Sequence, residues 1–212
     1  MSIVRLVWHD ARDLSLEFQY AGQDLSHFIN DRKISQLSNA IQQRIMLDIG
    51  NGLDYIHNQN IIHRDIKAEN ILFDNIKMQA VLCDFGLATK SSIPLQCAGG
   101  TPPYIPPEYL YDMKRGKPGD IWAFGITLLF VFGIIPLPRD DWNIAEASRL
   151  GEAREKMVTW LDKVRKSIPK KGHPLLRQML AKDSAKRITA PSLASKLQED
   201  MKKSSTRFRL AA

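Results

Sequence analysis

Residues 63–70 read His-Arg-Asp-Ile-Lys-Ala-Glu-Asn, and an Asp-Phe-Gly tripeptide begins at Asp84, nineteen residues after Asp65. The first stretch holds a carboxylate at Asp65, a lysine at Lys67 and a carboxamide at Asn70, and Asp84 adds a second carboxylate. Phosphoryl transfer needs such a set, because a base orients the attacking hydroxyl, a cation neutralises the moving phosphoryl group and two oxygen ligands bind Mg²⁺. Either His-Arg-Asp or Asp-Phe-Gly alone occurs by chance in many chains. The pair at this spacing, with the asparagine in register, is a specific signal.

Length and composition are those of an ordinary globular protein. The chain has 212 residues, of which 44% are hydrophobic and 25% charged, enough for one sizeable domain or two small ones. Two cysteines, Cys83 and Cys97, make no disulfide framework, so we expect an intracellular location, cytoplasmic or nuclear. The first residues lack a basic region followed by an apolar core, so we expect no signal peptide.

One long apolar stretch, residues 121–137, raises the question of a membrane span. It contains Gly125, Gly133 and Pro136 and has seventeen residues, whereas a span requires about 20. We therefore expect a helix that starts near Asp120 and is buried on all sides, and no membrane association.

The net charge of +7 raises the question of nucleic-acid binding. Aromatic residues do not alternate with the basic ones, so we interpret the charges as solvated helix faces and expect no nucleic-acid partner. The basic residues of the last third are Lys163, Arg165, Lys166, Lys170, Lys171, Lys202 and Lys203.

Alternating apolar residues predict two short strands at the start of the chain. Residues 3–8 and 14–20 read as strands joined by a polar turn. In the second, alternate apolar residues from Leu14 to Tyr20 fall on one face, which is typical of a half-buried strand. Asp24 then provides a carboxylate that can cap a short helix.

Helical periodicity is strongest after the first strands. From Ser38, apolar residues recur at three- and four-residue steps as far as Ile56, which predicts a long helix. Further amphipathic helices are predicted at 144–166, 174–181 and 191–203.

A predicted hairpin links the two polar motifs. Residues 71–73 and 81–83 read as its strands, and pairing them would bring Asn70 close to Asp84. Residues 86–108 are rich in glycine and proline, which predicts a long irregular loop beside the site.

With these segments assigned, the chain resembles serine/threonine protein kinases over residues 3–200. The resemblance implies an α+β fold that is mainly α: a kinase-like large lobe with a short two-stranded remnant of the small lobe at the N-terminus. The corresponding division is a remnant of strands and hinge at 1–20, the large lobe at 21–203 and a basic tail at 204–212.

The resemblance implies a role for each polar residue of the motifs. Asp65 would orient the substrate hydroxyl and accept its proton, and Lys67 would neutralise the transferred phosphoryl group. Asn70 and Asp84 would hold Mg²⁺. Thr101 would bond to Asp65 and help to select a hydroxyl substrate. The implied cofactors are ATP and Mg²⁺, and the implied partner is a protein substrate.

Four residues of the implied ATP site lie at or near the predicted strands. Glu17 and Gln19 resemble the hinge, whose backbone pairs with adenine. Leu16 would limit the pocket behind the adenine, and Leu72 would form its floor.

Two structural links also follow from the resemblance. Asp120 would anchor the backbone of the catalytic loop, and Arg187, in a motif with Asp183, would pair with Glu108. We interpret His63 as a packed structural histidine.

The chain departs from the family pattern in three places. The usual Ala-Pro-Glu reads Pro-Pro-Glu up to Glu108, and Cys97 stands where the activating phosphothreonine usually lies, which leaves Ser91 and Ser92 as phosphorylation candidates. The first glycine is Gly22 and the first lysine is Lys33, and both follow the predicted hinge. The residues before the hinge therefore include no glycine-rich phosphate loop and no third-strand lysine.

The third departure leaves alternatives open. The chain is a kinase of doubtful autonomous activity, a pseudokinase-like interaction module, or a fragment of a full-length kinase. In the second case, we expect a protein partner to cover the exposed small-lobe side.

Overall fold

The computed structural model describes residues 2–13, 15–96, 99–139, 142–147, 149 and 151–210. The expectations for Leu14 and Cys97 lie outside the described residues.

Helix α1, Asn39–Asn58, forms where the apolar periodicity predicts a long helix. The Ser38 side chain caps it by accepting a hydrogen bond from the Ile41 amide at 3.5 Å. The apolar residues at helical spacing face inward and are buried, namely Ile45, Ile49, Leu53 and Ile56. Helix α1 packs against α6, Ala190–Leu210, and against strand β6, Gln79–Leu82.

Helix α3, Lys117–Val131, is the buried centre of the molecule. Every residue from Gly119 to Val131 is buried, as the uniformly apolar sequence predicts. The helix begins three residues before Asp120 and ends at Val131, although the apolar stretch continues to residue 137. Among the helices that the structure describes, none is both long and apolar enough to cross a bilayer.

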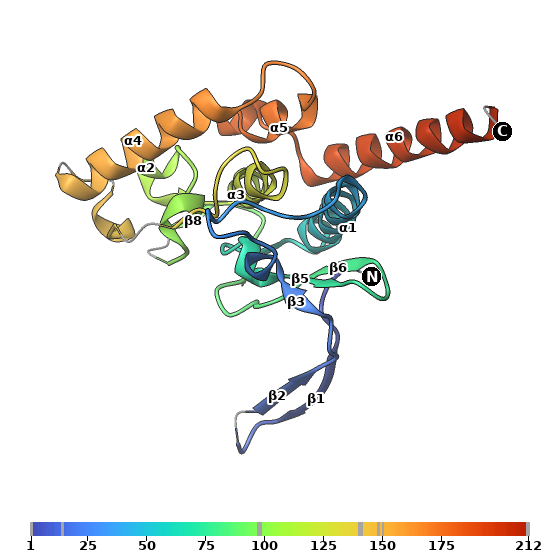
Figure 1. Ribbon diagram of the computed structural model, residues 1–212. Coiled ribbons are helices and arrows are strands. Elements are labelled where there is room, and N and C mark those ends of the chain that lie inside the picture. Colours follow the sequence, from blue (N-terminus) through green and yellow to red (C-terminus); the bar gives the residue numbers. More distant parts are fainter. Residues whose placement is uncertain are drawn as a thin grey trace.

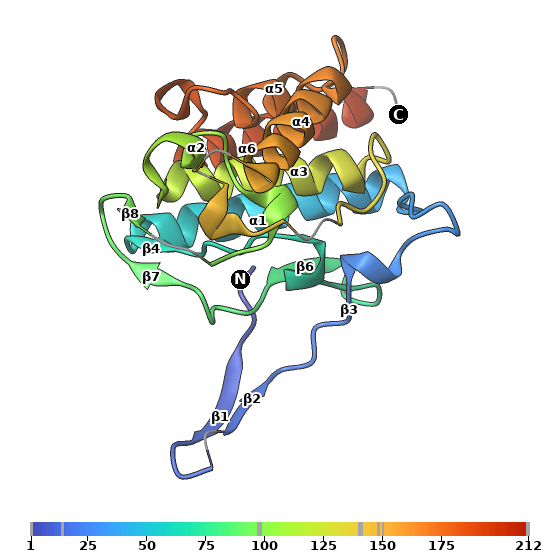
Figure 2. The same cartoon turned by 90° about the vertical axis from the view of Figure 1, so that its left-hand side faces the viewer.

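Helices α4 and α5 lie on one side of α1 and α3, and strands β3 and β6 lie on the other (Figure 2). Residues 144–146 form a separate 3₁₀ turn, so the predicted helix over 144–166 starts late, as α4. The bounds of the remaining helices are α2 Tyr109–Asp112, α4 Glu152–Ser167 and α5 Pro174–Met179.

The predicted hairpin is confirmed as strands β5, Ile71–Asp74, and β6, with Ile71 opposite Leu82. Strand β3, Gln23–Asp24, adds to it in the order β3-β5-β6. The Asp74 carboxylate fixes the turn by accepting hydrogen bonds from the next backbone amides.

The prediction that residues 86–108 contain no regular structure is wrong. Two strands of two residues each form there and pair with other segments, β7 with β4 and β8 with β9. A 3₁₀ turn also forms at Pro102–Tyr104. The bounds of these strands are β4 Ile61–Ile62, β7 Thr89–Lys90, β8 Leu95–Gln96 and β9 Lys114–Arg115.

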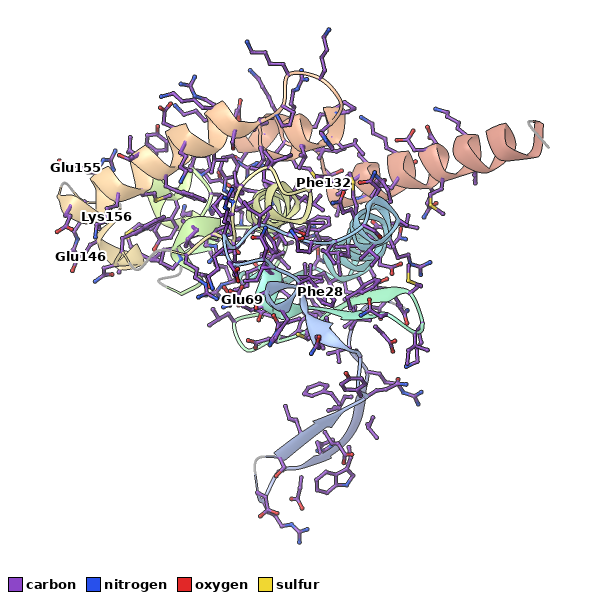
Figure 3. All side chains as sticks on the ribbon, in the orientation of Figure 1. Phe28, Glu69, Phe132, Glu146, Glu155 and Lys156 are labelled. Carbon is purple, nitrogen blue, oxygen red and sulfur yellow. The ribbon has the colours of Figure 1, made fainter. Side chains whose placement is uncertain are left out.

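Strands β1, Leu6–Asp10, and β2, Ser15–Phe18, form an antiparallel hairpin that projects from the body (Figure 1). Figure 3 shows its side chains standing clear of the rest of the chain. The prediction of a half-buried face is wrong here, because no other described layer packs on it and Leu16 is 62% exposed. The first strand also starts later than predicted, since Ile3 instead bridges to Leu82 of β6.

Candidate active site

The loop from His63 to Asn70 connects β4 to β5, and the side chain of Asp120 holds its backbone. One carboxylate oxygen of Asp120 accepts the His63 amide at 2.8 Å and the other accepts the Arg64 amide at 2.8 Å. His57 Nε2 lies 3.0 Å from the same carboxylate. These bonds stabilise Arg64 at φ 72°, in the left-handed region that non-glycine residues rarely adopt.

The pKa of Asp120 follows from this network. Burial alone would raise the pKa of the carboxyl, but the hydrogen bond and charge of His57, with further contributions from His63 and the Arg64 amide, hold the pKa below its usual value. Asp120 is therefore an anionic anchor for the loop from His63 to Asn70.

The carboxylate of Asp65 gathers three of the other predicted site residues around it. Its Oδ1 accepts a hydrogen bond from the Thr101 hydroxyl at 2.8 Å. Its Oδ2 lies 3.0 Å from Lys67 Nζ and 3.1 Å from Asn70 Nδ2. Lys67 Nζ also donates to Thr101 Oγ1 at 3.0 Å. Asp65 as a whole residue is only 8% exposed. Its carboxylate is therefore largely shielded from water, and its hydrogen bonds hold the neighbouring side chains in place.

Asn70 and Asp84 stand at the open end of the β5–β6 hairpin. The Cys83 amide donates to the Asn70 carbonyl at 3.0 Å, so Asp84 follows directly after the residue that pairs with Asn70. Asp84 is exposed and adopts φ 58°, and its Oδ1 accepts the Gly86 amide at 3.1 Å.

These two side chains suit Mg²⁺. The Asn70 amide nitrogen donates to the Asp65 carbonyl and carboxylate, which leaves its Oδ1 as a ligand, and Asp84 keeps one carboxylate oxygen. Mg²⁺ takes few protein oxygens and completes its shell with water and phosphate. Within the described ranges, no group of three or more His, Cys, Asp or Glu side chains could hold a metal ion.

His63 joins the two halves of the site. It is fully buried, with Nε2 at 3.1 Å from the Cys83 carbonyl and Nδ1 at 3.3 Å from the Asp65 amide. Burial lowers its pKa, although the Asp120, Asp65 and Asp84 charges oppose this. The sequence indicated a packed histidine, and the structure adds that its ring bridges the loop and the strand before Asp84.

The segment around Thr101 is held by side chains that sequence reasoning missed. Arg115 is 2% exposed and donates to the Gly99 carbonyl at 2.8 Å and to the Arg64 carbonyl. Trp160 of α4 donates its indole N–H to the Pro103 carbonyl at 2.6 Å. Nothing in the sequence distinguishes these side chains, because the bonds to Arg64 and Pro103 join segments that lie 51 and 57 residues apart.

The predicted pair of Glu108 and Arg187 forms a bidentate ion pair. The two guanidinium nitrogens lie 2.9 and 2.8 Å from the two carboxylate oxygens. The guanidinium also lies 5.2 Å from the centre of the Trp122 ring, so the end of the loop is tied to the buried centre.

The residues predicted for adenine are not gathered in the same way. Leu72 lies in β5, close to Asn70, whereas Leu16 and Glu17 lie on the projecting hairpin. The Gln19 amide donates to the Arg5 carbonyl at the base of that hairpin. A cavity of about 540 Å³ beside Gln19 includes neither Leu16 nor Leu72 in its lining.

Comparisons with known proteins identify the family of this chain. The family model "Protein kinase domain" matches residues 1–197. A serine/threonine-protein kinase of Drosophila persimilis is 41% identical over 107 residues, which cover 47% of this chain and 14% of that protein. The cAMP-dependent protein kinase catalytic subunit of Dictyostelium discoideum is 30% identical over 184 residues, covering 86% of this chain and 27% of that protein.

Serine/threonine-protein kinase 33 of Bos taurus is 30% identical over 163 residues, which cover 70% of this chain and 32% of that protein. The chain thus spans less than a third of the length of each of these relatives. Because the family model matches almost the whole of it, the chain belongs to the protein kinase domain family.

Proposed function

We propose that this chain carries the phosphoryl-transfer half of a serine/threonine protein kinase that uses ATP and Mg²⁺. The observation that carries the proposal is the Asp65 carboxylate, which bonds at once to Thr101, Lys67 and Asn70. When bound, Mg²⁺ neutralises charge on the triphosphate as its terminal phosphoryl group is transferred.

Each residue has a task that its position supports. Asp65 orients the hydroxyl of the substrate and accepts its proton. Lys67 lies within 3.0 Å of both Asp65 and Thr101 and stabilises negative charge beside that hydroxyl. The Oδ1 of Asn70 and the carboxylate of Asp84 would hold Mg²⁺. Since the Thr101 hydroxyl already bonds to Asp65, an aliphatic hydroxyl is the group that this carboxylate accommodates, which favours serine and threonine as substrates.

The 212 residues include no glycine-rich loop and no lysine before Lys33. Losing a single preorganised donor lowers catalytic rates by ~10²–10³, and here several donors to the phosphates are missing. We therefore propose that these residues alone transfer phosphate slowly, and that a full rate requires the phosphate-covering elements from a longer chain or from a partner protein.

The absence of a disulfide framework in the sequence supports a reducing, intracellular compartment.

The test is incorporation of labelled phosphate from Mg·ATP into a mixed serine and threonine peptide library. We expect Asp65→Asn to lower incorporation by about 10² or more. The matched control is Asp31→Asn, which makes the same change at an exposed turn residue and leaves incorporation unaltered. Equal incorporation by the unmodified chain and by Asp65→Asn would exclude catalysis by these residues.

The second candidate is a non-catalytic interaction module, and the exposed hairpin β1–β2 favours it. Large apolar side chains on a projecting edge, such as Trp8 at 51% exposure, are typical of a surface that another protein covers. Mg·ATP that binds the folded chain raises its melting temperature. A rise that Asp84→Asn abolishes supports the kinase, whereas no rise together with no phosphate incorporation supports the interaction module.

A further inference from the structure

An open groove lies between α2 and α4, outside the residues that surround Asp65. It encloses about 510 Å³, and its floor includes Trp122 and Leu180, both at least 95% buried. Helices α2 and α4 lie next to each other in both views of the ribbon (Figures 1 and 2). A volume of this size accepts a bulky side chain together with part of its backbone.

The walls of the groove are apolar and unusually exposed. Tyr111 of α2 is 71% exposed and Val158 of α4 is 47% exposed. Leu161 of α4 also lines the groove and is half-buried against the core. Tyrosine and aliphatic side chains that line a concave surface provide most of the affinity in many interfaces. The walls therefore favour an apolar anchor from a partner.

The rim of the groove is mainly basic. Arg154, Arg165 and Lys182 line it, against one acidic residue, Asp162. Arg165 lies 2.7 Å from Asp162, but both side chains are well exposed, and such surface pairs contribute little free energy. The lining thus carries a net positive charge.

Charge also varies along α4. Its first turn carries Glu152 and Glu155, and its last turn carries Arg165 and Lys166. In Figure 3 the labelled Glu155 marks the end of α4 that lies away from α5. Acidic groups of a partner would therefore lie along the half of the groove nearer α5, where Arg165 and Lys182 stand.

We propose that this groove binds an acidic peptide segment that places one bulky apolar side chain between Tyr111 and Leu161. The charge complementarity selects the occupant, since an apolar anchor alone would not require the basic rim. This binding does not require phosphoryl transfer, so it stands whether or not the chain is an active enzyme.

Helix α4, which lines the groove, also contacts the segment that follows Thr101. Trp160, one residue before Leu161 on α4, donates its indole N–H to the carbonyl of Pro103, two residues after Thr101. A peptide bound along α4 would therefore lie on the element that holds this segment, and a protein bound there would present its other regions to the same side of the molecule.

The test is fluorescence anisotropy of labelled ten-residue peptides that carry one phenylalanine or leucine, preceded or followed by four glutamates, added to the full chain without ATP. We expect binding that weakens with added salt. Replacing the apolar anchor by alanine, or the glutamates by glutamines, should weaken binding by about tenfold or more.

Variants of the chain locate the site. Tyr111→Ala and the double variant Arg165→Glu, Lys182→Glu should each weaken binding by about tenfold. Lys171→Glu makes the same kind of charge change at an exposed loop residue outside the groove and should change affinity by less than about twofold. Unaltered thermal unfolding identifies the variants that remain folded.

Three outcomes would overturn the proposal. One is no binding by any of these peptides below about 1 mM. Another is binding that Lys171→Glu weakens as much as the groove variants, which would show attraction by net charge only. The third is a single-stranded oligonucleotide that competes for the groove at lower concentration than the peptides, which would identify a nucleic-acid surface instead.

Discussion

At the scale of single residues, Asp120 holds the backbone of the loop from His63 to Asn70, because one buried carboxylate accepts the amides of His63 and Arg64 and contacts His57. Asparagine at this position keeps the volume but presents an NH₂ group to a donor. We expect Asp120→Asn to lower the free energy of unfolding by about 3 kcal/mol, measured by urea unfolding at pH 7. Asp31→Asn, at an exposed site, should change it by less than about 0.5 kcal/mol.

The pH dependence of stability tests whether the charge of Asp120 is the cause of this stabilisation. Because the folded-state pKa of Asp120 is lowered, its stabilisation is complete above the unfolded pKa near 4 and is lost as the pH falls through the lowered value. The unmodified chain should therefore lose more stability than Asp120→Asn on acidification below pH 4. A constant difference between the two would show that the charge is not responsible.

We also expect His63 to make the folded state less stable on acidification, at a higher pH than Asp120 does. Its buried ring accepts the Asp65 amide at Nδ1, which requires the neutral form, and its pKa is lowered below 6.5. The unfolded chain therefore binds more protons as the pH falls below about 6.5, and the folded state loses stability there.

Urea unfolding between pH 8 and pH 5 measures this effect. Relative to His63→Gln, which does not titrate, the unmodified chain should lose up to about 1.4 kcal/mol per pH unit below pH 6.5. Parallel stability profiles for the two chains would contradict the buried neutral histidine.

At the scale of elements, the pair of Glu108 and Arg187 connects the end of the long loop to the turn before α6. The Arg187 guanidinium is fully buried and also donates to backbone carbonyls of Pro118 and Ala181. Removing only the carboxylate leaves a buried charge without its counterion. We expect Glu108→Ala to lower the free energy of unfolding by roughly 3–5 kcal/mol.

An exposed ion pair of the same kind is the control for this prediction. Glu152 pairs with Lys156 at 3.0 Å on the surface of α4, and Glu152→Ala should cost less than about 1 kcal/mol. If the two variants unfold at the same urea concentration, burial does not set the strength of the Glu108 pair.

At the scale of the whole molecule, the projecting hairpin β1–β2 is the part that burial does not stabilise. Its exposed apolar side chains favour association, because removing them from water is favourable and both strand edges are open. We expect the double variant Val7→Lys, Leu16→Lys to lower self-association, measured by sedimentation velocity at increasing concentration. Its thermal unfolding should stay unchanged, since Val7 and Leu16 are 58% and 62% exposed.

A lysine substitution outside the hairpin tests whether the hairpin itself causes the self-association. Tyr55→Lys replaces another exposed apolar side chain, on α1, and should leave self-association unaltered. Equal effects of the hairpin and Tyr55 variants would indicate general surface charge rather than the hairpin.

Several features of the fold and the site followed from local sequence. The period of apolar residues predicted α1, and the Asp65, Lys67 and Asn70 spacing predicted a polar cluster that the structure does bring together. The β5–β6 hairpin followed from two short apolar runs and a turn. Each of these signals lies within a few tens of residues, where backbone geometry decides which side chains meet.

Other features required the folded chain. Arg115 donates to the Arg64 carbonyl and Trp160 donates to the Pro103 carbonyl, and local patterns do not relate these segments. Local patterns also did not predict the exposure of Leu16. Alternation in β2 predicted a buried face, but alternation only states that two faces differ. Whether either face is covered depends on which other elements are present to pack against it.

The sequence by itself determined the chemistry of this protein: the carboxylates, lysine and amide of one loop and one hairpin, because their spacing is short and their backbone is regular. Only the tertiary structure decided how that chemistry is held and what surrounds it. Arg115 contacts Arg64 across 51 residues and Trp160 contacts Pro103 across 57 residues, and contacts of that kind exist only after the buried centre around α3 has brought distant segments together.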